Sequence, residues 1–466
     1  MILDARNSSV GLDHDADYAI IGGGVAGITL ARRLARRHRV VIAESGGLEA
    51  DPATQRLYEG TSSGLNYSLS GSRLRFLGGS SNHWGGWCSP YAPEDFQPHS
   101  WVEHSGWPVS WNEVNAYIEH AAEILDLGGS DFDTGRITSS APKLSAFERG
   151  EIGFRMYRFS KPVTRFGEKY RSWLEHERNV TLLLNANLVD LGTNSDSRIT
   201  GANIRTLTGR TGTLRARHYI LACGGIENAR LLMAINRQKH GRLGNQGDCV
   251  GRFFMEHPHI TLARIAPHDL LWCQQQRALY RDGEHWMGLG MRLQPEALEK
   301  RRCLDFTAHF FSLECESDMR IGLRAMTAQA PNPRSRIRLE PEVDALGMPR
   351  AHLEWHLTDF DWHSMRVCSE ALGRHLGMLG TGRARIPDWL RDRDPNAIGY
   401  GSHHMGTTRM AESPEHGVVD ANCRVFGTSN LHVAGSSVFS TSGAVNPTLT
   451  LTALALRLAE HLEKLS

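Results

Sequence analysis

The sequence predicts an α/β protein with two domains, one built on a Rossmann-type parallel sheet and the other on a largely antiparallel sheet. Near the N-terminus, residues 17–44 read as a short apolar strand, a glycine-rich turn, a helix and a second strand. Between residues 265 and 395, strand-like pieces alternate with turns and with one long helical segment. The first pattern is typical of a βαβ unit, and the second of strands that pair with their neighbours along the chain.

Charge and hydropathy exclude several functional classes. The 466 residues include 52 basic and 51 acidic side chains, a net charge of +1, with no long block of one sign. This balance argues against a nucleic-acid groove or a surface for anionic membranes. No apolar run approaches the ~20 residues of a membrane span. The polar N-terminus at residues 1–18 lacks the pattern of a secretory signal. We therefore expect a cytoplasmic protein with no nucleic-acid or membrane partner.

Cysteine and histidine spacing predicts no metal centre. The eight cysteines are scattered and none forms a C-x-x-C pair, so neither a disulfide framework nor a zinc cluster is expected. Glu256, His257 and His259 lie close together around a proline. Such spacing suits a loop, and a further ligand would have to come from elsewhere in the chain. We predict that these residues bind no metal.

The glycine-rich turn carries a dinucleotide-binding pattern. In a strand–turn–helix unit that fits G-x-G-x-x-G, Gly22 makes the tight turn and Gly24 lets the backbone approach a pyrophosphate. Gly27 lets the helix pack closely on the strand, and Glu44, at the end of the second strand, can accept hydrogen bonds from ribose hydroxyls. A glycine-rich turn in an unrelated α/β protein is the alternative. The pattern does not choose between FAD and NAD. The predicted site comprises Gly22, Gly24, Val25, Ala26, Gly27 and Glu44.

Residues 71–88 favour a flavin. They are dense in glycine and small hydroxyl residues, which let the backbone lie flat against a ligand. The run Arg75-Phe76-Leu77-Gly78-Gly79-Ser80-Ser81 resembles the first signature of the glucose–methanol–choline (GMC) oxidoreductases. That family consists of FAD-dependent enzymes that oxidise alcohols and sugars. The resemblance implies FAD, a fold like that of p-hydroxybenzoate hydroxylase, and cofactor contacts from Gly78, Gly79 and Ser80.

The next residues are similar to one branch of the family. Ser81-Asn82-His83-Trp84 is similar to the pyranose oxidase and fructose dehydrogenase branch, so we expect Asn82, His83 and Trp84 to contact FAD. In some members of that branch the matching histidine is bonded covalently to the flavin 8α-methyl. Asn82 stands where a threonine is often found. We therefore favour a His83 that packs on the isoalloxazine without a bond over a covalent link.

Later segments also resemble FAD-binding elements of the family. They are the turn that begins at Cys223, the strand at residues 187–190, the strand end near Gly435, and the helix opened by Asn446-Pro447-Thr448. The N-terminus of that helix directs partial positive charge toward the flavin. The contacts implied are Leu188, Cys223, Gly224, Gly435, Ser436, Asn446 and Thr448.

The stretch from residue 401 to residue 450 carries the predicted chemistry. Oxidation of an alcohol by hydride transfer needs a base for the hydroxyl proton, and a neutral imidazole is suited to that task. An amide can hold the alkoxide-like oxygen without competing for the proton. The family's His-x-x-Gly-Thr motif matches residues 403–407, which implies His403 as base, His404 as its neighbour and Asn446 as partner. The alternative is that both histidines only form hydrogen bonds within a loop and have no catalytic role.

The order of the motifs predicts the domains and the reaction. We expect FAD-dependent oxidation of a secondary alcohol, a ring hydroxyl of a sugar or glycoside, to a ketone. Oxidation of a non-sugar alcohol, a non-redox flavoprotein lyase and a dinucleotide-binding regulatory protein are the alternatives. No residue pattern decides between oxygen and another electron acceptor. The FAD-binding domain is predicted at 1–95, 178–262 and 400–466, and the substrate-binding domain at 96–177 and 263–399.

Overall fold

The computed structural model describes residues 1–465 except 139–147, 149, 196, 240, 242, 276–279, 283 and 314–320. Its first layer is a six-stranded sheet in which every pairing is parallel. All four residues of its central strands β3 and β4 are buried, as expected for a sheet covered on both faces. In sheet order the strands are β1 (Ile2–Asp4), β7 (Val180–Leu184), β4 (Val40–Ala43), β3 (Tyr18–Ile21), β11 (His218–Leu221) and β21 (Leu431–Val433).

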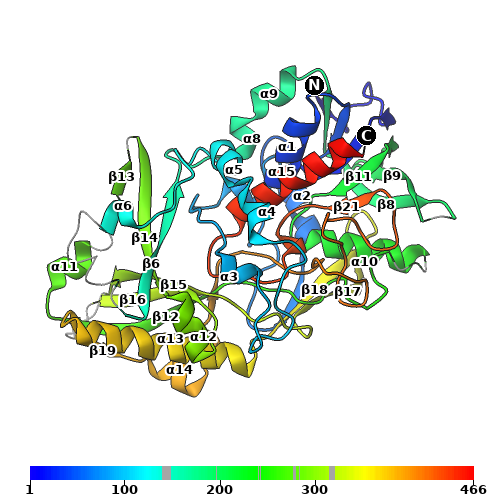
Figure 1. Cartoon of the computed structure of the whole chain (residues 1–466). Helices are drawn as coiled ribbons and strands as arrows, with labels where there is room; N and C mark the ends of the chain where they lie inside the picture. The colour runs from blue at the N-terminus through cyan, green and yellow to red at the C-terminus, as the bar shows by residue number, and fades with distance from the viewer. Residues whose placement is uncertain are drawn as a thin grey trace.

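Helices from opposite ends of the chain cover this sheet. Helix α1 (Val25–Leu34) packs against α15 (Thr448–Lys464), and α5 (Ile118–Ile124) packs on α15 in turn. Figure 1 shows the blue α1 beside the red α15. Helix α10 (Glu227–Lys239) contacts β8 (Asn187–Thr193) and β17 (Arg336–Val343). The closing helix of the chain thus starts beside the N-terminal glycine turn.

An antiparallel meander adjoins the parallel sheet, but it is shorter than the sequence suggested. We expected short meander strands throughout residues 178–222. The meander contains only β8 (Asn187–Thr193), β9 (Ile199–Arg205) and β10 (Thr211–Arg215), with β2 (His14–Asp15) added in parallel at its edge. The two outer strands, β7 and β11, are apolar and mostly buried, so they join the parallel sheet instead.

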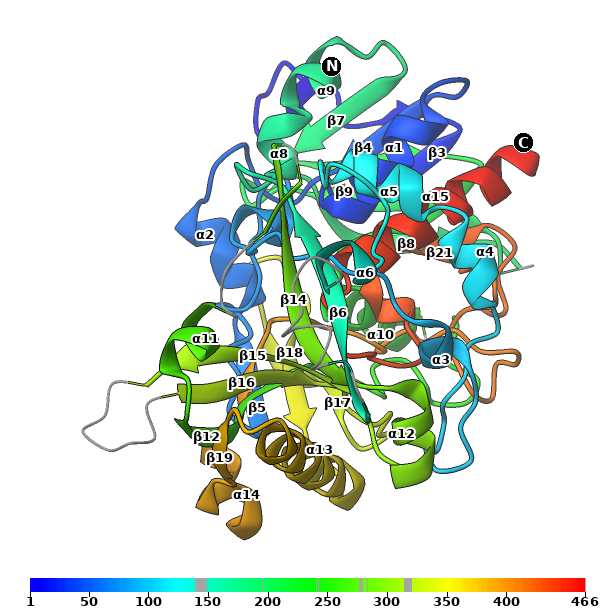
Figure 2. The same cartoon turned by 60° about the vertical axis from the view of Figure 1, so that its left-hand side comes forward.

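The second large sheet has eight strands, and all its pairings are antiparallel. Helix α13 (Asp359–Met378) packs against β12 and β19 on one face, as Figure 2 shows. The sheet confirms the expected mixed α/β architecture. Its strands are β6 (Ile152–Phe159), β12 (Pro258–Pro267), β13 (Tyr280–Asp282), β14 (His285–Leu293), β15 (Phe306–Ser312), β16 (Ile321–Thr327), β19 (Gly382–Arg385) and β20 (Gly399–Tyr400).

A three-stranded sheet joins strands from distant parts of the chain. Strands β17 (Arg336–Val343) and β18 (Pro349–Trp355) are antiparallel, and β5 (Gly60–Gly64) pairs with β18 in parallel. The segment 263–399 therefore contributes to two different sheets. We retain the division into two domains as a proposal; residues 139–147 and 314–320 of the proposed substrate domain lie outside the described residues.

The remaining described helices are short connections. None of the helices in the described part of the chain is long and apolar enough to cross a membrane. These connections are α2 (Pro52–Gln55), α3 (Pro93–Phe96), α4 (Trp111–Asn115), α6 (Gly135–Thr138), α8 (Phe166–Lys169), α9 (Arg171–His176), α11 (Leu270–Gln275), α12 (Pro295–Arg301) and α14 (Asp388–Asp392).

Candidate active site

A cavity of about 510 Å³ lies where the parallel strands β3, β4 and β11 end. Its wall includes His403 and all but two of the residues predicted to contact the cofactor. The exceptions are Gly27 and Asn82. The Asn82 amide instead donates to the carbonyls of Leu77 and Gly79, at 2.9 Å each, and so holds the shape of the turn. The members on the wall are Gly22, Gly24, Val25, Ala26, Glu44, Gly78, Gly79, Ser80, His83, Trp84, Leu188, Cys223, Gly224, Gly435, Ser436, Asn446 and Thr448.

Three glycines of the first turn are needed for different reasons. Gly22 has φ +114°, and a Cβ there would lie 2.5 Å from the Ala222 carbonyl oxygen. A Cβ on Gly27 would lie 1.9 Å from the Gly22 carbonyl oxygen, so Gly27 allows α1 to pack on its own turn. A Cβ on Gly24 would meet no protein atom within 4 Å, although Gly24 lies on the cavity wall. The space beside Gly24 is thus left for a ligand.

Alanine substitutions should separate these roles. Gly27→Ala is expected to lower the unfolding temperature of the protein with or without FAD, because overpacking costs about 1–3 kcal/mol. Gly24→Ala should leave the melting of FAD-free protein unchanged and weaken FAD binding roughly tenfold or more, a loss of about 1.4 kcal/mol. Thermal melting and FAD titration measure both effects. Equal FAD affinity in Gly24→Ala and the parent protein would contradict this assignment.

Glu44 lies where the ribose-binding carboxylate was predicted, and it also stabilises the turn. Its Oε2 accepts from the Gly23 N–H at 2.7 Å, and its Oε1 accepts from the Gly46 N–H at 2.8 Å. Burial raises the pKa of Glu44, although these two backbone hydrogen bonds oppose the shift. The Ser45 hydroxyl also donates to Oε1 at 3.4 Å, whereas Oε2 keeps a second lone pair that can accept from a ribose hydroxyl.

A buried ion network in the cavity wall was not predicted as part of the site. The Glu227 carboxylate lies 3.3 Å from Arg73, 3.1 Å from Arg75 and 2.7 Å from Arg230. Burial opposes ionisation of Glu227, but Arg230, Arg75 and Arg73 outweigh it and lower its pKa to about 2. Arg73 and Arg75 also lie over the Tyr58 ring. The signal was present, because Arg75 and Glu227 belong to two of the motifs that resemble the family.

His83 and Trp84 lie together on the cavity wall. The Trp84 indole N–H donates to the Thr164 carbonyl at 2.8 Å, and Arg165 donates to the Ser81 and Trp84 carbonyls. Burial, with a smaller contribution from Arg165, lowers the pKa of His83. The imidazole is therefore kept neutral at the cavity.

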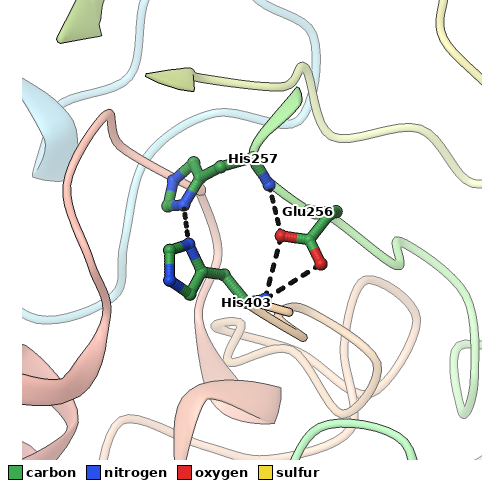
Figure 3. Close-up of side chains that lie close together, drawn as sticks. All are labelled: Glu256, His257 and His403. Atoms are coloured by element: carbon green, nitrogen blue, oxygen red, sulfur yellow. Dashed lines mark hydrogen bonds between the residues drawn. The ribbon is translucent and has the colours of Figure 1, made fainter. Parts of the chain in front are cut away.

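His403 and Asn446 meet at the cavity, although they are far apart in the sequence. The Asn446 Nδ2 atom lies 3.1 Å from His403 Nε2. On the other side of the ring, His403 Nδ1 lies 2.8 Å from His257 Nδ1 (Figure 3). The His257 Nε2 atom lies 3.0 Å from the Ser442 carbonyl oxygen and 3.1 Å from that of Gly443.

These contacts determine the tautomers of both imidazoles. Because two carbonyl oxygens can only accept, His257 must carry its proton on Nε2, and its Nδ1 is then an acceptor in the neutral ring. His403 must therefore donate from Nδ1, which leaves the lone pair of its Nε2 toward Asn446 and the cavity. Burial, with the neighbouring histidines, lowers the pKa of His403 well below its ordinary value. The ring is thus a neutral base directed at the cavity.

Glu256 fixes the backbone of the loop that carries His403. Both carboxylate oxygens lie 2.9 Å from the His403 N–H, and they also accept from the His257 N–H at 2.8 Å and the Tyr67 hydroxyl at 2.7 Å. Burial raises the pKa of Glu256 to about 7 in spite of these hydrogen bonds. Ligand atoms of Glu256, His257 and His403 lie within 4.8 Å of one another, which is close enough to share a metal ion. Their hydrogen bonds already use these atoms, so we keep the prediction of no metal.

His404 has a different environment from His403. It is buried, and its ring contacts those of Tyr67 and Phe254. Its carbonyl accepts from the Ser436 hydroxyl at 2.6 Å, and burial lowers the pKa of its ring to about 3. His404 lies on the cavity wall, but the contact to Asn446 belongs to His403.

Comparison with known proteins identifies the cofactor and the family. Residues 17–239 match the family model for FAD dependent oxidoreductases, and residues 331–455 match that for GMC oxidoreductases. The fructose dehydrogenase large subunit of Gluconobacter japonicus is 22% identical over 83% of this chain and 80% of its own length. The C-glycoside 3-oxidase of Microbacterium trichothecenolyticum is 25% identical over 83% of this chain and 75% of its own.

Solved structures share the fold. The pyridoxine 4-oxidase from Mesorbium loti superposes with a TM-score of 0.67 and 18% identity, covering 96% of this chain and 99% of its own. The Gly24 cradle and the carboxylate of Glu44 fit a dinucleotide in the cavity. The first family model spans the Gly22 turn and Glu44, and the second spans His403 and Asn446, with residues 240–330 between them. The protein is an FAD-dependent member of the GMC oxidoreductase family.

Proposed function

We propose that this protein oxidises a secondary alcohol, a ring hydroxyl of a sugar or glycoside, to a ketone, with His403 as the base. The observation that carries the proposal is the unprotonated Nε2 of His403, which lies on the cavity wall and accepts a hydrogen bond from the Asn446 amide. Two relatives are named for sugar substrates, a fructose dehydrogenase and a C-glycoside 3-oxidase, which supports a sugar or glycoside here.

Different residues of the cavity have different roles in activating the alcohol. His403 Nε2 takes the hydroxyl proton, and the Asn446 amide donates to the alkoxide-like oxygen that remains. His257 accepts from His403 Nδ1 and so keeps the lone pair on Nε2. Bound FAD would supply the hydride acceptor, flavin N5, for the carbinol carbon. Glu256, which accepts from the backbone N–H of His403, positions the base without touching the substrate.

The position of a second histidine, His259, favours a substrate with more than one hydroxyl group. His259 lies on the same cavity wall, and its ring centroid is 6.1 Å from that of His403. Its Nε2 is buried and has no hydrogen-bond partner among the described residues. Burial, with a smaller effect of Arg324, lowers the pKa of His259 to about 4, so the ring is neutral. We propose that His259 hydrogen-bonds a second hydroxyl of the substrate, which a simple alcohol lacks.

The proposed activity predicts bleaching of the flavin by sugars. Purified holoenzyme mixed anaerobically with fructose, glucose or a C-glycoside should lose its oxidised-flavin absorbance with at least one of them. Ethanol serves as the control alcohol without a second hydroxyl, and pyridoxine as a non-sugar alcohol. Oxygen and an artificial acceptor, tested separately, identify the acceptor for reoxidation.

Three outcomes would count against parts of the proposal. Turnover of a sugar with no bleaching would indicate a non-redox lyase. If pyridoxine bleaches the flavin and no sugar does, the substrate is a non-sugar alcohol. Acid precipitation should release the flavin into the supernatant, because we propose that His83 packs on it without a bond; yellow colour in the pellet would indicate a covalent link.

A further inference from the structure

A second cavity, of about 400 Å³, is strongly basic and shares no residue with the wall of the first. We call it the arginine pocket. Strand β17 supplies two of its arginines, the segment before β12 supplies another, and the end of β18 closes it. Its lining residues are Ser63, Arg252, Arg334, Arg336, Arg338, Glu354, His356 and Leu357.

The charges of the arginine pocket do not balance. Arg252 donates through Nε to Asp248 at 3.0 Å, and Arg338 donates to Glu354 at 2.7 Å. Arg336 reaches Asp248 only at 3.5 Å. The four arginines thus share two carboxylates, which leaves two positive charges without a counter-ion. The exposed Arg334 side chain has no hydrogen bond or ion pair among the described residues.

Arg336 provides a second, independent sign of a ligand. Its side chain is only 10% exposed, and its Nε is buried with no hydrogen-bond partner in the described part of the chain. A buried guanidinium with an unmet N–H is costly, because the desolvation of that group is not repaid. Burial and the nearby Arg252 also lower the pKa of Arg336, as expected when like charges meet away from water.

We propose that the arginine pocket binds a small oxyanion, a phosphate or carboxylate group, through Arg334 and Arg336. A guanidinium offers parallel N–H donors that match the oxygens of such a group, and the anion would neutralise the surplus charge. The size of the pocket suits a free ion or the anionic group of a small metabolite. Inorganic phosphate and citrate represent these two chemistries in a test.

The anion would also join two segments of the fold. Strand β17 hydrogen-bonds to the segment before β12, through the Ile337 N–H to the Gly251 carbonyl at 2.8 Å and the Phe254 N–H to the Ser335 carbonyl at 2.9 Å. The backbones of Arg252 and Arg336 pair as an isolated β-bridge at this junction. An anion bound by Arg334 and Arg336 beside that bridge should therefore raise the unfolding temperature of the protein.

The test is calorimetric titration and thermal melting of the FAD-loaded protein with inorganic phosphate and with citrate, against chloride at equal ionic strength. We expect saturable binding of at least one oxyanion and a higher unfolding temperature than in chloride. Arg334→Gln should weaken that binding roughly tenfold or more, because hydrogen bonds to charged groups are worth about 1.5–3 kcal/mol. Sugar turnover without the anion should stay unchanged in this variant.

Arg385→Gln is the matched control, because Arg385 is exposed and paired with Asp388 outside the pocket. It should bind the oxyanion as the parent protein does. Arg336→Gln should also lose binding; since Arg336 is buried and could be needed for folding, the exposed Arg334 carries the decisive comparison. The proposal is overturned if phosphate, citrate and chloride act alike, or if Arg334→Gln and Arg385→Gln bind equally well.

Discussion

Replacing His403 by alanine should slow the reduction of bound FAD by substrate by roughly 10²–10⁴-fold, the usual contribution of a general base. The cavity and the contacts predicted for FAD remain, so flavin content should not change. Anaerobic stopped-flow absorbance measures the rate directly. An undiminished rate would remove His403 as the base.

His404→Asn is the control for the choice between the two adjacent histidines. His404 packs against Tyr67 and Phe254 and lacks the Asn446 contact, so its replacement should cost far less than that of His403. Both variants must first be shown to hold a full complement of FAD. A larger loss in His404→Asn than in His403→Ala would reverse the assignment.

The pH dependence of the parent enzyme follows from the same imidazole. The neutral ring is the active form, and burial lowers the pKa of His403 well below its ordinary value. The base is therefore already free at neutral pH. The rate of flavin reduction should be level from neutral to mildly alkaline pH and should fall only on acidification, as His403 takes up a proton.

Asn446→Asp should be the second most damaging change, although the two side chains have nearly the same shape. The amide now lies 3.1 Å from His403 Nε2, where a carboxylate would accept instead of donate. An opposite charge at this distance raises the pKa of an imidazole by about 1–3 units. The pKa of His403 would rise from its lowered value, and the alkoxide-like oxygen would face a carboxylate in place of a donor, so we expect a loss of roughly 10²–10³-fold in the rate of flavin reduction.

The pH profile distinguishes this effect from the loss of an oxygen-binding group. In Asn446→Asp, the fall in rate on acidification should begin at a higher pH than in the parent, because the carboxylate raises the pKa of His403. Asn446→Ala loses the donor without adding charge, so its rate should be low at every pH and its profile should keep the shape of the parent. An acid limb at the same pH in Asn446→Asp and in the parent would contradict the proposed contact.

Local sequence patterns allowed much of the fold to be predicted. The pairing of strands that are far apart in the sequence could not be predicted from them. The first βαβ unit, the GMC family and FAD followed from residues close together in the chain and are confirmed. Apolar runs show that a strand is buried, but they do not show which strand it pairs with. For that reason β7 and β11 were placed in a meander when they belong to the parallel sheet.

The same distinction applies to the candidate site. His403 and Asn446 were paired in the prediction because each belongs to a recognisable motif. A metal role for His257 was considered and rejected, but its contact to His403 was not predicted, since the two residues lie 146 positions apart in the sequence. The ion network of Arg73, Arg75 and Glu227 was missed for the same reason, because charge compensation depends on side chains that meet only after folding.

The pair of imidazoles has a consequence for the fate of the substrate proton. His257 is bounded by the Ser442 and Gly443 carbonyls, which have no proton to pass on, and burial lowers the pKa of His257 to about 3. A proton on His403 therefore has no route through the protein interior behind it. It must leave from the side on which it arrived, through the cavity. It can pass there either to solvent that enters after the ketone has departed or to the acceptor that would reoxidise the flavin.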